Sequence, residues 1–353
     1  MKKRMIGLAL LIVIMLVIGG IYMAIGRAPQ IITVDGYVGG EKIELLEDEE
    51  VQAILEEDYG VKADYSRAGS LDMMTADMDG MDYLFPSSSI AEEYYEDLHG
   101  SPEQSEIVLN TPIVLYTHRA VLDAFDSQGL ITSSGNSYYI DMTKLVELIR
   151  NDTSWADIGL PELYGNISVD TTDPARSNSG NMFAALLANV LNGGQTLTQE
   201  NLQTILPQLQ DIFGKLGYME TSSSDLFSQF LRMGIGAKPV IAGYESQLIE
   251  YAALYPDQYE TMKDDIVMLY PTPTVWSTHV FIALDANGQV LLNGLLDEDI
   301  QRLAWEKHGF RTGNYTTVSE SGSLNAQGVA DTITQVTQVP SYDVMKEIIE
   351  QLQ

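Results

Sequence analysis

Side chains that could act as nucleophiles or metal ligands are few in this chain and widely spaced. The sequence contains no cysteine and four histidines, His99, His118, His279 and His308. No two histidines have the spacing of a helical metal-ligand pair, and no Gly-x-Ser-x-Gly elbow occurs. His118 and His279 fall on or beside expected strands, where structural histidines are the commoner case. The sequence therefore indicates a protein that is not an enzyme, with neither cofactor nor bound metal.

Hydroxyl, amide and glycine residues gather instead in one loop before an apolar run. Residues 173–180 read DPARSNSG, and residues 181–191 are apolar on every side, which predicts a buried helix. Residues 166–170 predict a short strand just before the loop. A helix N-terminus offers free N–H groups and partial positive charge, which suit an anion or a carboxylate. The alternative is a well-capped helix start that binds nothing.

The same order of strand, polar loop and helix recurs near the N-terminus. Expected strands at 31–34, 61–65 and 82–85 lead into glycine- or serine-rich loops at 35–40, 67–71 and 86–89, each before a helical pattern. This alternation predicts a parallel α/β sheet, with ligands outside the carboxyl ends of its strands.

A second α/β set follows in the middle of the chain. A strand at 107–116, interrupted near Pro112, leads to helices at 145–150, 199–216 and 224–233 and to a strand at 239–242 with its own loop at 243–247. Strands at 266–269 and 275–284, a turn at Asn287-Gly288 and helices at 297–308 and 342–352 complete the chain. Residues 322–338 predict a polar excursion without clear periodicity.

Charge and the N-terminal segment limit the partners and the location. Fifty acidic residues against nineteen basic ones give a formal net charge of −31, which opposes binding to nucleic acid. The basic residues Lys2, Lys3 and Arg4 precede an apolar stretch over 5–25. Such a segment predicts either a transmembrane anchor with an extracellular soluble part or a cleaved export signal. Both alternatives place the rest of the chain outside the cell membrane.

Three stretches, taken in order, resemble the extracellular solute-binding proteins of ABC transporters. They are the loop DPARSNSG at 173–180, the loop GYESQ at 243–247, and the strand, helix and Gly-Phe ending over 278–311. The resemblance is to the two-lobed type II periplasmic-binding-protein family that includes molybdate and phosphate binders. It implies an α/β fold with discontinuous lobes: lobe one from 31–115 and 275–353, lobe two from 116–274, and residues 1–30 as signal peptide or signal anchor.

The resemblance also implies a function and a site. The expected function is capture of a small ligand, in the first instance an inorganic oxyanion, between lobes that close about a hinge, with an ABC permease or another membrane complex as partner. The alternative is a membrane-tethered sensor or interaction module without a transport role. Asp35 departs from the pattern of many oxyanion binders, since its carboxylate would repel an anion in the cleft. The candidate ligand-binding residues are Tyr37, Gly39, Gly40, Ser70, Ser87, Ser88, Arg176, Ser177, Asn178, Ser179, Tyr244 and Glu245, with Arg67 as a further source of positive charge.

Overall fold

The computed structural model describes residues 15, 31–312 and 324–352. The signal or anchor segment predicted for residues 1–30 lies outside the described residues apart from Met15. Among the residues that are described, no helix combines the length and the apolar character needed to cross a membrane.

The first sheet has strands in the order β2-β1-β3-β9-β4, with short β10 also paired to β4. β1 is parallel to both β2 and β3, which confirms the parallel arrangement predicted from the strand, loop and helix order. β9 joins β3 and β4 in antiparallel register. The bounds are β1 Ile32–Val38, β2 Val61–Arg67, β3 Tyr83–Phe85, β4 Gln104–His118, β9 Trp276–Ala283 and β10 Arg311–Thr312.

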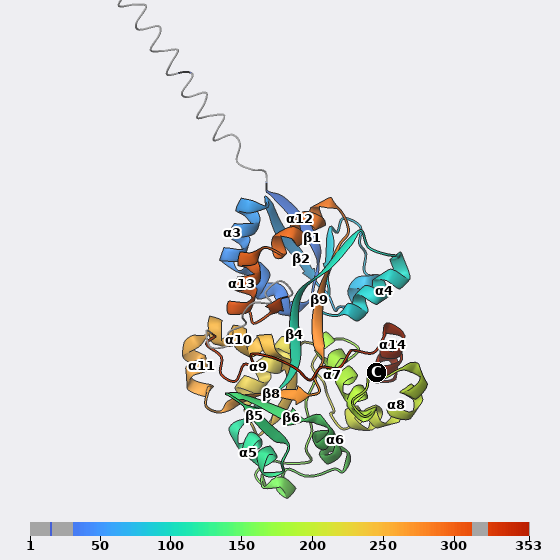
Figure 1. Cartoon of the computed structure of the whole chain (residues 1–353), viewed down its shortest axis with the longest axis vertical. Helices are drawn as coiled ribbons and strands as arrows, with labels where there is room; N and C mark the ends of the chain where they lie inside the picture. The colour runs from blue at the N-terminus through green and yellow to red at the C-terminus, as the bar shows by residue number, and fades with distance from the viewer. Residues whose placement is uncertain (1–14, 16–30, 313–323, 353) are drawn as a thin grey trace, which may run out of the picture.

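β4 continues into a second sheet and so belongs to both (Figure 1). Its first part, through Pro112, pairs with β9, and its last residues pair with β7 and β8. Pro112 therefore does not interrupt the strand, contrary to the prediction. The remaining strands of the second sheet are β5 Ile131–Ser134, β6 Ser137–Asp141, β7 Val240–Tyr244 and β8 Ile266–Thr272.

Helices cover both sheets. The helices around the first sheet are η1 Gly40–Lys42, α2 Ile43–Glu47, α3 Glu49–Asp58, η2 Asp72–Thr75, α4 Ser89–His99, α12 Ala286–Leu295 and α13 Glu298–Glu306. Those around the second sheet are α5 Arg119–Ser127, α6 Met142–Arg150, η3 Ala156–Ile158, α7 Asn178–Leu191, α8 Gln199–Gly214, α9 Ser223–Met233, α10 Glu245–Leu254, α11 Pro256–Met262 and α14 Tyr342–Gln351.

Separate apolar cores lie under the two sheets. We call the part built on the first sheet lobe one and the part built on the second sheet lobe two. The core of lobe one unites side chains of β1, α3, β3, α12 and α13. Most of α7 is buried in the core of lobe two, as the apolar run predicted. The interlobe division at residues 115 and 275 stays a prediction.

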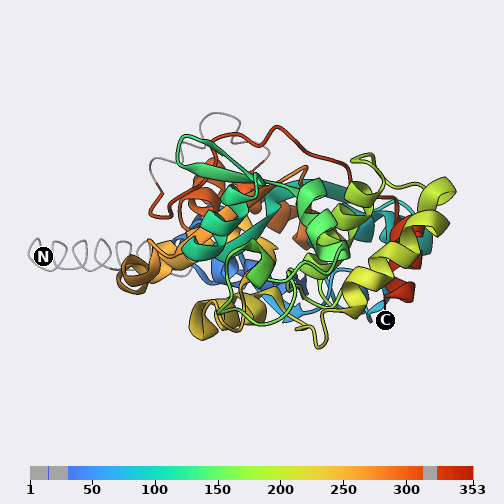
Figure 2. The same cartoon turned by 90° about the horizontal axis from the view of Figure 1, so that it is seen from below.

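The C-terminal helix α14 lies where the two lobes meet. Its Val344, Met345 and Ile348 belong to the core of lobe two, beside α7 and α8 (Figure 2). The sequence had assigned residues 275–353 as a block to lobe one. The helix also contacts α4 of lobe one, where the ring of Tyr342 stacks on that of Tyr94, so α14 packs against both lobes.

Several local predictions were wrong for identifiable reasons. Residues 166–170 form isolated bridges only, one of them between Asp170 and Ile241. β1 extends to Val38, so Asp35 lies inside a strand, where its backbone N–H donates to the Asp82 carboxylate. The predicted turn at Asn287-Gly288 lies within α12, because the Asp285 carboxylate caps that helix by accepting from the Gly288 N–H at 2.9 Å.

Candidate functional site

A pocket of about 210 Å³ lies between the two lobes, at the carboxyl ends of β1 and β2. Lobe one contributes the segments that follow these strands, and lobe two contributes the segments that begin α7 and α9. A parallel sheet places its strand-end loops together, which is why these distant segments meet. We call this the outer pocket; it is lined by Gly39, Gly40, Glu41, Arg67, Ala68, Gly69, Ser70, Arg176, Ser177, Asn178, Thr221, Ser222, Ser223 and Ser224.

Two arginines line the outer pocket, one from each lobe. Arg67 ends β2 and Arg176 precedes α7, and both are exposed. Neither forms an ion pair with any residue of the described ranges. The lining thus holds two guanidinium groups without an ion-pair partner among the described residues, next to one carboxylate, that of Glu41, which is paired with Lys42. The Arg67 guanidinium lies directly against the backbone of Gly40, where a larger residue would collide with it.

The loop before α7 is held in shape by its own side chains. The Asp173 carboxylate accepts from the Ala175 N–H at 2.9 Å, and Ser177 is the N-cap residue of α7. Gly180 packs against the carbonyl of Thr172, where a Cβ atom would collide with backbone. The Ser179 hydroxyl is buried and lies 2.7 Å from the Thr172 hydroxyl. The loop therefore presents Arg176, Ser177 and Asn178 to the pocket, while Ser179 points inward.

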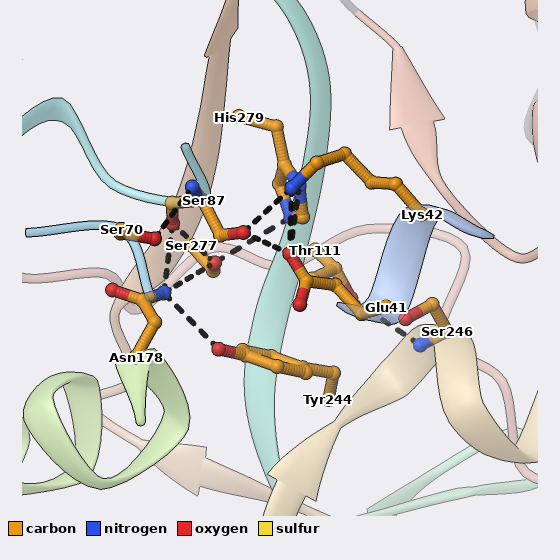
Figure 3. A network of polar contacts seen from close by, with 10 residues as sticks. All are labelled: Glu41, Lys42, Ser70, Ser87, Thr111, Asn178, Tyr244, Ser246, Ser277 and His279. Atoms are coloured by element: carbon orange, nitrogen blue, oxygen red, sulfur yellow. Dashed lines mark hydrogen bonds and ion pairs between the residues drawn. The ribbon is translucent and has the colours of Figure 1, made fainter. Parts of the chain in front are cut away.

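A second group of polar side chains extends from Glu41 into the interior of the protein (Figure 3). We call it the deep cluster; its members are Glu41, Lys42, Ser87 and His279. Lys42 is 0% exposed. Its Nζ donates to Glu41 Oε1 at 2.6 Å, to Ser87 Oγ at 2.7 Å and to His279 Nδ1 at 3.2 Å. The Ser87 hydroxyl also donates to Glu41 Oε1. An ammonium group has three hydrogens, so every donor of Lys42 is satisfied inside the protein.

Burial governs the titration of the deep cluster. Loss of hydration lowers the pKa of Lys42, and the adjacent Glu41 carboxylate offsets part of this effect. Burial, reinforced by the Lys42 charge, lowers the pKa of His279 well below its ordinary value. The imidazole is therefore neutral and accepts at Nδ1 from Lys42, with its Nε2 3.5 Å from the Ser277 hydroxyl.

Asn178 connects the lobes at the boundary between the outer pocket and the deep cluster. Its side-chain nitrogen, from α7 in lobe two, lies 2.8 Å from the Ser87 carbonyl oxygen and 3.2 Å from Ser277 Oγ, both in lobe one (Figure 3). The same nitrogen lies 3.0 Å from the Tyr244 hydroxyl oxygen. The Ser277 hydroxyl in turn donates to the Ser87 carbonyl at 2.7 Å. One amide group thus links strand ends of both lobes.

The structure brings half of the predicted site residues to the outer pocket. These are Gly39, Gly40, Ser70, Arg176, Ser177 and Asn178, joined by the additional residue Arg67.

The other predicted site residues lie elsewhere. The Tyr37 hydroxyl donates to the Asp77 carbonyl. Ser88 is the buried N-cap of α4, where its hydroxyl accepts from the Ile90 N–H. Glu245 is fully buried in an ion pair with Arg311 at 2.6 Å and does not face the pocket. Side chains of Ser87, Ser179 and Tyr244 are also buried and engaged within the protein.

Sequence reasoning missed Glu41, Lys42, Ser277 and the serine run at the start of α9. The run reads TSSS at 221–224, the same pattern as the serines at 87–89 that were singled out, so this signal was available. Lys42 and Glu41 resembled ordinary residues of an exposed helix start, and nothing in their spacing indicates burial. In the described part of the chain, no three His, Asp or Glu side chains come together in a group that could hold a metal ion.

Comparison with known proteins identifies the fold. No family model matches the sequence, and no curated protein matches it. Among solved structures, the sulfate-binding protein SubI from Mycobacterium tuberculosis has a TM-score of 0.56 at 13% identity, over 89% of this chain and 95% of that one. The periplasmic binding protein AfuA from Actinobacillus pleuropneumoniae, with fructose-6-phosphate bound, has a TM-score of 0.59 at 14% identity, over 91% and 96%.

A third similar structure has a different ligand class in its name. The apo ferric ion-binding protein A from Pasteurella haemolytica has a TM-score of 0.55 at 14% identity, over 91% of this chain and 97% of that one. The chain therefore has the two-lobed α/β fold of extracellular and periplasmic solute-binding proteins, and the resemblance seen in the sequence is confirmed at the level of the fold. At such identities the likeness carries no ligand from those proteins to this one.

Proposed function

We propose that the protein is an extracytoplasmic solute-binding protein that captures a small anion in the outer pocket. The observation that carries this proposal is the pair Arg67 and Arg176, which approach the pocket from opposite lobes without a carboxylate partner among the described residues. Of the three similar structures, two are named with sulfate or a sugar phosphate and one with ferric ion, so their names guide the choice of test ligands and do not carry the proposal. An inorganic oxyanion is the first ligand to test.

Apart from Glu41, the rest of the lining is neutral and supplies hydrogen-bond donors around this charge. Ser70, Ser177 and the serines of the 221–224 run carry hydroxyl groups. Hydrogen bonds from arginine to an oxyanion are charge-assisted and about twice as strong as those between neutral groups. Because both lobes contribute donors, a bound anion stabilises the closed arrangement of the lobes, and β4 with the segment leading into β9 provides the hinge.

Calorimetric titration of the full chain with sulfate, phosphate and molybdate tests the proposal. We expect saturable binding of at least one oxyanion. We expect Arg67→Gln with Arg176→Gln to weaken it by at least about 150-fold, since each charged hydrogen bond contributes about 1.5–3 kcal/mol and the two together at least about 3 kcal/mol. Arg150→Gln is the matched control: it removes an exposed arginine at the end of α6 and should leave the affinity unchanged.

The opposite outcomes contradict the proposal. If the double variant binds as tightly as the parent, the outer pocket is not the site. If the unaltered protein binds none of these anions, a sugar phosphate is tested next. Failure there favours a tethered sensor or interaction module with a binding-protein fold.

A further inference from the structure

The deep cluster has the composition of an anion site. It joins a buried ammonium group to a buried hydroxyl, and both donate to a single oxygen atom, Oε1 of Glu41. The Phe85 ring covers the ammonium group at 4.9 Å from its centroid, which keeps water from the cation. Burying a lysine is costly unless its charge is paired and hydrogen-bonded. The fold meets this cost with a carboxylate of its own.

Glu41 is placed between this cluster and the outer pocket. Its side chain is 11% exposed and lines the pocket, whereas Lys42 and His279 are 0% exposed. Among the four members of the deep cluster, Glu41 alone belongs to the lining of the outer pocket. A solute in the pocket therefore meets the carboxylate of Glu41 before it could reach Lys42.

We propose that the Glu41 carboxylate is an internal ligand of an anion site formed by Lys42 and Ser87, and that it excludes oxyanions from this site. Its role in confining a captured oxyanion to the outer pocket rests on the proposed function; its role as an internal ligand does not. Glu41 is then a specificity residue: it occupies the inner donors and presents negative charge to any solute that approaches them. His279 acts as a positioning residue, because its Nδ1 accepts the third hydrogen of Lys42.

Chemical rescue of Glu41→Ala tests the internal ligand directly. This substitution removes the atoms of an acetate ion and leaves Lys42 and Ser87 facing the vacated space. We make it in the Arg67→Gln/Arg176→Gln background, so that the outer pocket contributes no response to anions. The measurement is the thermal unfolding midpoint of the full chain in sodium acetate and sodium sulfate, with sodium chloride at equal ionic strength as reference.

We expect Glu41→Ala to lower the midpoint, and acetate or sulfate to restore most of the loss in a saturable manner, because an anion that binds only the folded state stabilises it. Adding Lys42→Met should abolish the rescue, since no buried cation is left to pair. Glu49→Ala is the matched control: Glu49 is an exposed carboxylate at the start of α3, and its loss should create no response to anions.

Glu41→Gln keeps the test decisive should the alanine variant not fold. The amide fills the same volume without the charge, so we expect a lower midpoint that acetate does not restore. The proposal is overturned if Glu41→Gln is as stable as its parent, if neither anion rescues a folded Glu41→Ala, or if the Lys42→Met variant is rescued equally. None of these results depends on whether the unaltered protein binds sulfate, so failure of the proposed function and failure of this inference are distinguishable.

Discussion

The outer pocket and the deep cluster share one residue, Glu41, and contain similar side chains whose hydrogen-bond donors differ in availability. Both contain a cation and serine hydroxyls near the carboxyl ends of β1, β2 and β3. In the deep cluster every hydrogen of Lys42 has a partner, whereas Arg67 and Arg176 have no ion-pair partner in the described chain. The comparison teaches that residue type alone does not identify a ligand site; the availability of the donors does.

The largest effect is expected when the cation of the deep cluster, Lys42, is removed. Lys42→Met leaves the Glu41 carboxylate beside buried groups without its counter-charge, and removing one partner of a buried ion pair costs about 3–5 kcal/mol of unfolding free energy. Denaturant unfolding measures this loss. Adding Glu41→Gln should recover most of it, since no unpaired charge then remains. A single variant as stable as the unaltered protein would contradict the view that the pair is structurally essential.

An effect of intermediate size is expected to distinguish the roles of Ser177 and Ser179 in binding and in stability. Ser179 is buried against Thr172, so Ser179→Ala should lower the unfolding free energy by about 1 kcal/mol and leave anion affinity nearly unchanged. Ser177 lines the outer pocket, so Ser177→Ala should weaken anion binding several-fold and change stability little. Calorimetric titration and denaturant unfolding of both variants check this. The reversed pattern would mean that the ligand reaches the interior side of the loop.

The smallest expected effect concerns pH at an ion pair between the lobes, beside a cavity that shares Gly40, Glu41 and Arg67 with the outer pocket. Glu250 of α10 lies 2.9 Å from His308, which follows α13, and so connects the lobes. Burial raises the pKa of Glu250 above its ordinary value of 4.5, with His308 acting in the opposite direction. The folded state then holds the proton where the unfolded state has lost it.

This contribution to stability is fully present below pH 4.5 and is lost as the pH rises through the raised pKa. Glu250→Gln removes it. We therefore expect the unfolding free energy of the unaltered protein, relative to that of the variant, to fall as the pH rises from 4.5 through the raised pKa of Glu250. Urea unfolding at a series of pH values measures the difference; a difference that is constant with pH would show that Glu250 titrates alike in both states.

Much of the fold was predictable because it depends on patterns along the chain. The strand, loop and helix order near β1, β2 and β3 led to the parallel sheet, and the apolar run led to the buried helix α7. The position of α14 was not predictable, because an amphipathic helix does not specify which core it covers.

The candidate site divides in the same way. Arg176, Ser177 and Asn178 stand in a loop whose composition is visible in the sequence. The burial of Lys42 depends on Ser87 and His279, which are far away along the chain and meet only in the folded protein. A lysine next to a glutamate reads as solvated surface, so long-range packing, and not local composition, creates the deep cluster.

The place of α14 has a consequence for the order in which the protein is made. Translation produces β5, β6, α7 and α8 long before Val344, Met345 and Ile348, yet these three side chains belong to the same apolar core. Domains generally fold as units during synthesis, from the N-terminus onward. Here the core of lobe two is incomplete while its own strands and helices have already left the ribosome. The apolar side chains of α7 and α8 that α14 covers therefore lack this cover until residues 342–351 have been made.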